Sequence, residues 1–222
     1  MSNKIKKVEG WYLPSKEKHF VSYLLQNQNN ENKGEYQKEQ RAKSFSYVEN
    51  YHLAIDIGAC VGFWSKDLCK NFERVICFEP YRDSAECLKK NLKSFNNYKL
   101  YQIGLSNVNG TQKLMYSENG IGSNSISDKN MRENIFVPIP TKKLDDFNFR
   151  RISYIKMDVQ FHELKVLEGA KKTLKTNSPV LCIECARRND KELNYVNAII
   201  NFLKSLDYNI VGGLGKELFF KK

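Results

Sequence analysis

The stretch AIDIGACVGFW, residues 54–64, predicts a strand, a glycine-containing loop and the first turn of a helix. An apolar run ends at Gly58, and Trp64, Leu68 and Phe72 then recur every four residues, which is the spacing of one helix face. Glycine lets the backbone turn sharply and approach another group closely. We therefore expect a ligand-binding turn between this strand and this helix.

The same alternation continues outward along the chain. Further strand-like runs are RVICFEP (74–80), YKLYQIGLS (98–106), ISYIKMD (152–158) and PVLCIE (179–184), with helical spacing at 85–95, 164–174 and 193–203 and a closing hairpin in YNIVGG and ELFFKK. This alternation predicts an α/β fold, a mostly parallel sheet with helices on both faces. Ligands of such sheets bind beyond the carboxyl ends of the strands.

Two regions depart from this alternation. Residues 1–50 are polar and contain helix candidates at 16–26 and 35–49, so we expect a helical extension or cap on a domain of residues 51–222. Residues 110–151 contain two strand-like runs, and Pro138 and Pro140 predict that the second lies at an edge or bulge. Between these runs, residues 122–125 (Gly-Ser-Asn-Ser) fit a substrate loop or an ordinary flexible loop.

The loop after the first strand excludes two common nucleotide sites. A dinucleotide fingerprint needs glycine where this chain has Cys60 and Phe63, and no Gly-Lys-Ser/Thr follows to make a phosphate-binding loop. What remains is Asp56 with two glycines. This set suits the cationic methionine end of S-adenosyl-L-methionine, which carries no phosphate. The alternative is a plain strand-to-helix turn with an incidental aspartate.

A second acid follows the next strand, at Glu79. An acid at that strand end can accept both ribose hydroxyls, as acids do in doubly wound nucleotide sites. The alternative is a carboxylate that complements the positive end of the following helix. Asp56 and Glu79 together favour the cofactor interpretation.

These motifs, in order over about residues 53–185, resemble the FkbM family of methyltransferases; the N-terminal GWYLPSKEKHF, with Tyr36, Gln37 and Arg41, is similar to some phage- or virus-type members. The resemblance implies a Rossmann-like class I methyltransferase with a seven-stranded sheet ending in an antiparallel hairpin. It implies O-directed activity, often on sugar hydroxyls. The implied cofactor contacts are Asp56, Gly58, Ala59, Gly62, Glu79, Pro80, Gly104, Leu105, Ser106 and Asp158. Cys60 and Phe161 depart from the family, which has Asn and Gly there.

A hydroxyl acceptor benefits from a nearby general base. Asp158, at the end of the fourth strand, is the first candidate, and His162 four residues later is either a second one or a packed or solvated side chain. Lys156 shares a strand face with Asp158 and needs a partner, for which Asp158 and Glu184 are candidates. This group either orients a hydroxyl acceptor or forms a structural ion pair.

Composition bounds the remaining expectations. The formal charge of +11 over 222 residues favours anionic partners, although scattered lysines are also common on any surface. Six cysteines include one lone Cys182-x-x-Cys185 pair, from which we expect neither a metal site nor a disulfide. No signal peptide or membrane span is visible, so we expect a cytoplasmic protein, in a host cytoplasm if viral. Oligomeric state is not predicted.

Three functions remain open. The first is an O-methyltransferase with a small-molecule, sugar or glycan acceptor. The second is a methyltransferase for RNA ribose or another nucleic-acid group, which requires basic and aromatic residues of the extension to line the cleft. The third is a cofactor-fold binding module without catalysis. The absence of an Asn-Pro-Pro-Tyr-type motif and of a Pro-Cys pair argues against methylation of DNA bases.

Overall fold

The computed structural model describes residues 5–26, 34–116, 120–121, 125–126, 135–187 and 189–222. Residues 122–124 of the predicted substrate loop lie outside the described residues, so that prediction stays open. Within the described part of the chain, no helix is both long and apolar enough to cross a membrane.

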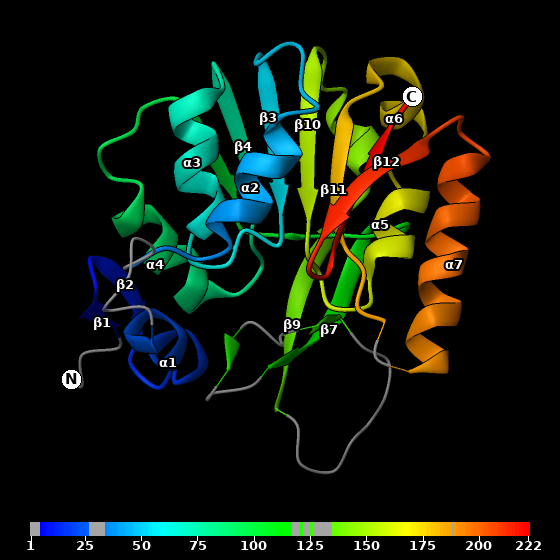
Figure 1. The fold of residues 1–222 in the computed structure, drawn as a ribbon. Helices are drawn as coiled ribbons and strands as arrows, with labels where there is room; N and C mark the ends of the chain where they lie inside the picture. The colour runs from blue at the N-terminus through cyan, green and yellow to red at the C-terminus, as the bar shows by residue number, and fades with distance from the viewer. Residues whose placement is uncertain (1–4, 27–33, 117–119, 122–124, 127–134, 188) are drawn as a thin grey trace.

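The centre of the molecule is a seven-stranded sheet in the order β12-β13-β11-β10-β3-β4-β5 (Figure 1). Neighbouring strands from β11 to β5 are parallel, whereas β13 is antiparallel to both β11 and β12. The predicted mostly parallel sheet with a C-terminal antiparallel hairpin is therefore confirmed. The strands are β3 (Leu53–Ile57), β4 (Arg74–Phe78), β5 (Tyr98–Tyr101), β10 (Ile152–Met157), β11 (Val180–Glu184), β12 (Asn209–Leu214) and β13 (Glu217–Lys221).

Helices cover both faces of this sheet, because its central strands are apolar on both sides. All five residues of β3 are buried, and alternate side chains enter different cores. Ala54 packs with α2 (Lys38–Phe45), α3 (Phe63–Asn71) and α4 (Arg82–Asn91). Ile55 packs on the other face with α5 (Glu163–Glu168), α6 (Lys171–Asn177) and α7 (Asp190–Lys204).

Two predicted elements are divided in the structure. YKLYQIGLS is not one strand: β5 belongs to the large sheet, whereas β6 (Gly104–Leu105) belongs to a second, four-stranded sheet. The helix predicted over 164–174 is interrupted at Gly169 and Ala170 between α5 and α6. A Cβ on Gly169 would lie 2.1 Å from the carbonyl oxygen of Ser106, so the chain passes too close to this backbone for a side chain.

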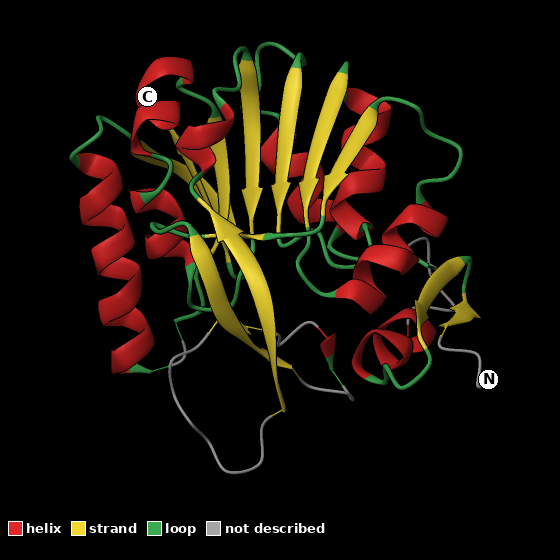
Figure 2. Cartoon of the chain, turned by 180° about the vertical axis from the view of Figure 1, so that it is seen from behind, coloured by secondary structure: helices red, strands yellow, loops and turns green. Residues whose placement is uncertain are grey.

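The second sheet lies beyond the carboxyl ends of the large sheet's strands, in the order β6-β9-β7-β8 (Figure 2). β6 pairs only with the last two residues of β9, Thr141 and Lys142. β9 therefore lies between β6 and β7 rather than at the edge of the sheet, but among the described residues no strand pairs with its second side at Pro138 or Pro140, where proline lacks an N–H to donate. The other strands are β7 (Gly110–Tyr116), β8 (Ser125–Ile126) and β9 (Ile135–Lys142), followed by a 3-10 turn at Leu144–Phe147.

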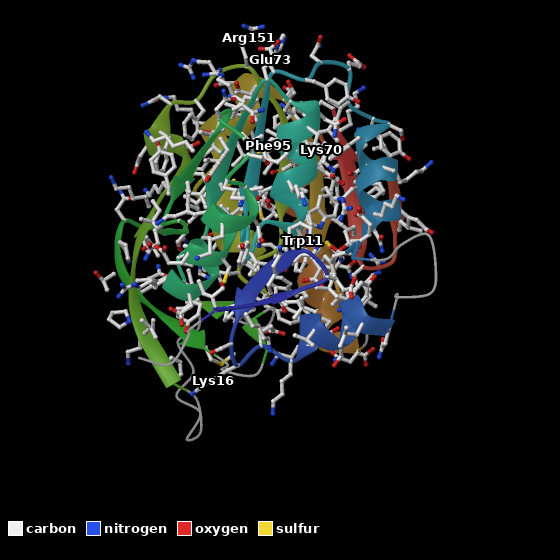
Figure 3. The ribbon with its side chains drawn as sticks, turned by 90° about the vertical axis from the view of Figure 1, so that its left-hand side faces the viewer. Trp11, Lys16, Lys70, Glu73, Phe95 and Arg151 are labelled. Atoms are coloured by element: carbon white, nitrogen blue, oxygen red, sulfur yellow. The ribbon has the colours of Figure 1, made fainter. Side chains whose placement is uncertain are left out.

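The N-terminal extension contains a hairpin that the sequence did not predict, β1 (Ile5–Val8) with β2 (Trp11–Pro14). The ring of Trp11, which is labelled in Figure 3, packs on Phe63 of the main domain, with 4.6 Å between the two ring centroids. α1 (His19–Gln26) and α2 fall within the two predicted helices but are shorter. The extension is therefore packed on the main domain through apolar contacts.

Candidate functional site

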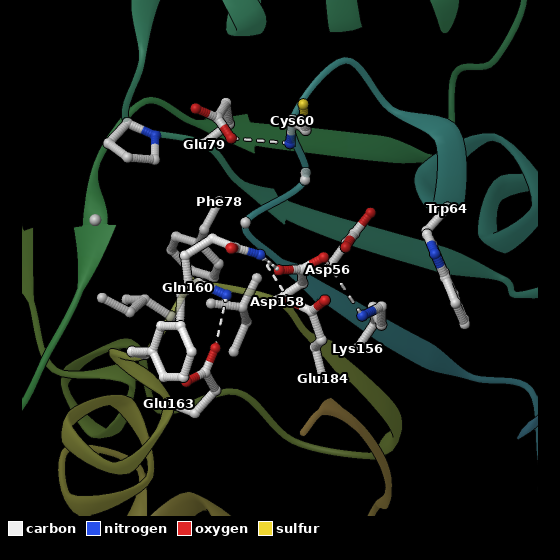
Figure 4. A pocket seen from close by; sticks show the side chains of 18 of the residues that line it. Asp56, Cys60, Trp64, Phe78, Glu79, Lys156, Asp158, Gln160, Glu163 and Glu184 are labelled. Carbon is white, nitrogen blue, oxygen red and sulfur yellow. Dashed lines mark hydrogen bonds and ion pairs between the residues drawn. The ribbon is translucent and has the colours of Figure 1, made fainter. Parts of the chain in front are cut away.

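A cavity of about 360 Å³ lies at the carboxyl ends of the parallel strands. Four adjacent strands each bring one carboxylate to it: Glu79 after β4, Asp56 near the end of β3, Asp158 after β10 and Glu184 at the end of β11 (Figure 4). Since carboxyl ends of parallel strands meet at one edge, residues far apart in sequence converge here.

The glycines of the turn after β3 serve close packing. Gly58 has φ +77°, and a Cβ there would lie 2.0 Å from the carbonyl oxygen of Asp158. Gly62 has φ +91° and packs on Leu88. A Cβ added to Gly62 would lie 3.3 Å from the Leu88 side chain. Gly58 and Ala59 line the cavity, whereas Gly62 lies behind the turn against α4.

Asp56 is held from within the protein. It is buried, and the hydroxyl of Ser65 donates a hydrogen bond to its Oδ2 at 2.5 Å. Burial raises the pKa of Asp56 to about 6, which the hydrogen bond from Ser65 and the charge of Lys156 oppose. The carboxylate therefore gains from any cation that enters the cavity beside it.

Glu79 holds the turn after β3 against the end of β4. The backbone N–H of Cys60 donates to its Oε2 and the N–H of Tyr81 donates to its Oε1, each at 2.8 Å. Burial raises the pKa of Glu79 to about 7. Cys60 takes φ +51°, a left-handed conformation that asparagine adopts more readily, which explains why Asn suits this position. Each carboxylate oxygen keeps a lone pair for a further donor.

At the side of the cavity formed by the ends of β10 and β11, side chains hydrogen-bond to one another. The amide of Gln160 donates to Asp158 Oδ1 at 2.7 Å and to Glu184 Oε2 at 2.6 Å, bridging two carboxylates. Burial, followed by the nearby Asp158, raises the pKa of Glu184 to about 8. This pair therefore holds a proton near neutral pH.

Lys156 is fully buried beneath this pair. Its Nζ lies 4.0 Å from Asp158 Oδ2 and 4.9 Å from the centroid of the Trp64 ring. Of the two candidate partners of Lys156, Asp158 and Glu184, the structure therefore shows Asp158. Glu184 instead pairs with Lys216 at 3.5 Å. Although burial alone would lower it, the surrounding acids, Asp158 first, hold the pKa of Lys156 above its usual value. The lysine stays charged.

Not every sequence candidate reaches the cavity. Pro80, Gly104 and Leu105 line it. Ser106 and His162 are buried outside its lining, where His162 Nε2 and the Ser106 hydroxyl lie 3.0 Å apart. The structure therefore gathers the acids and leaves His162 packed against the strand-end loop.

Other lining residues were not singled out from the sequence. Glu163 is buried, accepts from the Val159 N–H and the Tyr195 hydroxyl at 3.1 Å each, and burial raises its pKa to about 7. In the sequence, Glu163 is the last residue of the segment DVQFHE (158–163), which could have marked it as a further acid near the strand end. The extension contributes Tyr36, together with His19 and Phe20.

Two of the six cysteines, Cys60 and Cys185, line the cavity. All six are free thiols, and burial raises the pKa of those at positions 69, 87, 182 and 185 to about 12. Within the described ranges, no group of three or more His, Cys, Asp or Glu side chains has the arrangement of a metal site.

Solved structures share the fold. The methyltransferase FkbM from Methylobacillus flagellatus matches with a TM-score of 0.57 and 18% identity, over 81% of this chain and 47% of that chain, so the chain spans about half of that relative. A Streptococcus mutans protein described as a methyltransferase, solved with S-adenosylhomocysteine (SAH), matches at TM-score 0.52 and 15% identity, over 84% and 96%. An rRNA methylase from Streptococcus thermophilus matches at TM-score 0.50 and 12% identity, over 83% and 94%.

At such identities the likeness establishes a Rossmann-like methyltransferase fold, as the sequence predicted. No curated protein matches the chain. The model of the methyltransferase FkbM domain, however, matches residues 56–210, which is more than half of the sequence. The chain therefore belongs to the FkbM family of S-adenosylmethionine-dependent methyltransferases.

Proposed function

We propose that the chain transfers a methyl group from S-adenosylmethionine to a hydroxyl of a sugar or glycan. The observation that carries this proposal is the row of four carboxylates at adjacent strand ends of one cavity. The row divides into a half that suits the cofactor and a half that suits a hydroxyl acceptor.

The half formed by Asp56 and Glu79 fits the cofactor. The ammonium and sulfonium groups of S-adenosylmethionine are cationic, and Asp56 is a buried carboxylate that lines the cavity. Glu79 offers the free lone pairs of two oxygens to a ribose diol. Pro80, Gly104 and Leu105 offer an apolar surface to the adenine. The residues present therefore fit the group.

The half formed by Asp158 and Glu184 supplies a base. When bound, the cofactor supplies an electrophilic methyl, whose bond electrons return to sulfur as the acceptor oxygen bonds to carbon. The pair accepts the proton that the hydroxyl loses, since Gln160 holds both carboxylates within 2.7 Å of its amide nitrogen. The ammonium of Lys156 lies 4.0 Å from Asp158 Oδ2 and forms an ion pair with this carboxylate.

The lining favours a neutral acceptor over a nucleic acid. Sugars are bound by carboxylates that accept from hydroxyls and by aromatic rings that pack on their C–H faces, and this cavity offers Glu163, Tyr195 and Phe161. The extension residues that line it are His19, Phe20 and Tyr36, which include no lysine or arginine. The whole lining contains five acids and two lysines, so the net charge of +11 comes from residues outside the cavity.

The test is methyl transfer from labelled S-adenosylmethionine to panels of neutral glycans and of RNA. We expect label in a glycan, lost with Asp158→Ala, while calorimetry shows unchanged cofactor affinity. Label in RNA instead, with binding that weakens steeply with salt, would establish the nucleic-acid alternative. No cofactor binding at millimolar concentration would refute both enzymatic functions and leave a binding module.

A further inference from the structure

The N-terminal extension, which precedes the matched family domain, contributes a side chain to the cavity. Tyr36 lies 20 residues before the start of the match at Asp56 and lines the same cavity as Asp158 and Glu184. The family domain is therefore not the whole of the site.

The residues on both sides of Tyr36 are bound to the main domain. Arg41 contacts Glu35 at 2.5 Å and Asp67 of α3 at 2.6 Å, and it is buried. Gln37 accepts a hydrogen bond from the Trp64 indole N–H at 2.7 Å and donates one to Glu217 of β13 at 2.7 Å. The backbone that carries Tyr36 is thus fixed to two elements.

The Tyr36 ring is also held. Its centroid lies 5.2 Å from that of Phe20, 5.1 Å from that of Tyr23 and 5.0 Å from that of Phe63. Among the described residues, none forms a hydrogen bond with the Tyr36 hydroxyl. A rigidly held phenol with an unused donor therefore faces a cavity lined by acids.

The protonation of this phenol is secured by its surroundings. Burial, followed by the charges of Asp158 and Glu184, raises the pKa of Tyr36 far above its usual value. The hydroxyl remains a donor at every physiological pH.

The charge of the cavity indicates what this donor binds. Carboxylates suit the cationic groups of S-adenosylmethionine but repel its own amino-acid carboxylate, which needs a hydrogen-bond donor. The amide of Gln160 is committed to two acids, Lys156 is paired with Asp158, and Lys216 is paired with Glu184. We propose that the Tyr36 hydroxyl binds the amino-acid carboxylate of the cofactor; this rests on the proposed function.

The test measures binding by calorimetry with two probes, SAH and 5′-methylthioadenosine, which lacks the amino-acid part. Tyr36→Phe removes the hydroxyl and keeps the ring. We expect it to weaken SAH binding about tenfold, the effect of one charge-assisted hydrogen bond, and to leave 5′-methylthioadenosine unchanged. Tyr23→Phe, on a ring that packs on Tyr36 outside the cavity lining, should change neither.

The other outcomes overturn the proposal. Equal weakening of both probes by Tyr36→Phe would show a packing effect, and unchanged SAH binding would show that the hydroxyl does not contact the carboxylate. Either result refutes only the proposed role of Tyr36 and leaves the proposed function standing. If the unaltered chain bound neither probe, the proposed function itself would fail.

Discussion

The turn after β3 (Gly58–Gly62) and the turn after β10 (Asp158–His162) lie at neighbouring strand ends but are built differently. The first is held mainly through backbone bonds, since two of its N–H groups bond to the carbonyl oxygen of Phe78 at 3.0 Å each, and Glu79 adds one side-chain bond to the Cys60 N–H. The second has a backbone bond from the Asp158 N–H to Ile57 at 3.0 Å, but it is held mainly by side chains, through the bonds of 2.7 and 2.6 Å from the Gln160 amide to two carboxylates.

The turns also differ in which residues adopt positive φ. The first uses Gly58 and Gly62 together with Cys60, whereas the second uses Gln160 at +52° and Phe161 at +68°. A left-handed conformation costs a residue with a side chain roughly 1–2 kcal/mol, and such strain persists where the surroundings impose it. The proposed cofactor half therefore depends mainly on backbone conformation, while the proposed acceptor half depends mainly on side chains.

The largest effect should come from adding a side chain at Gly58, where the turn after β3 approaches the turn after β10. Gly58→Ala would place a Cβ 2.0 Å from the carbonyl oxygen of Asp158, and we expect it to lower the free energy of unfolding by about 3 kcal/mol. Gly10→Ala is the matched control, because Gly10 has a similar φ of +83° and nothing within 4 Å of a Cβ. It should cost about 1 kcal/mol. Urea unfolding measures both, and equal losses would refute the close approach.

The next effect separates catalysis from binding in the second turn. Glu184→Gln should lower turnover about 100-fold, as removal of a general base does, and leave SAH affinity unchanged. Because the base acts only when ionised, and the pKa of Glu184 is raised to about 8, turnover of the unaltered chain should rise with pH and level off above about 8. A turnover that does not vary between pH 6 and 9 would exclude this pair as the base.

A smaller effect tests the first turn. Glu79→Ala removes the acceptor of the Cys60 and Tyr81 N–H groups, and calorimetry should show SAH binding at least tenfold weaker, about 1.4 kcal/mol. Glu73→Ala is the control, since Glu73 is exposed at the opposite end of the molecule, beside Arg151 (Figure 3). Equal affinities of the two variants would remove Glu79 from the cofactor site.

The smallest effect concerns the strain at Phe161, whose side chain is 48% exposed. Phe161→Gly should raise the free energy of unfolding by about 0.5–1 kcal/mol, because glycine adopts φ +68° freely. Phe161→Ala removes the ring but keeps the strain, so thermal unfolding of both variants separates the two contributions. A glycine variant no more stable than the alanine variant would show that the turn is unstrained.

The sequence predicted the central sheet well, because buried parallel strands are uninterrupted apolar runs and the helices between them keep their spacing. It missed the β1–β2 hairpin, since IKKV and WYLP are only four residues each and alternate weakly. It joined β5 to β6, because an apolar run does not show which of two sheets its residues enter.

The strand-end acids were predictable for a topological reason, as any residue that ends a parallel strand reaches the same edge. The position of His162 was not, because the dihedral angles of Gln160 and Phe161 decide where the turn sends it. Tyr36 was not predictable as a cavity residue either. It is placed there by its neighbour Gln37, whose side chain makes long-range hydrogen bonds to α3 and β13.

The row of carboxylates has a consequence for product release. On the proposed function, the cofactor enters the cavity with a sulfonium charge and leaves as a neutral thioether, while Asp56, Glu79, Asp158 and Glu184 stay in place. Acids attract the charged sulfur and gain nothing from the neutral one. The same side chains therefore bind the methyl donor more strongly than its demethylated product. Methyl transfer itself thus favours the replacement of the product by a new cofactor molecule.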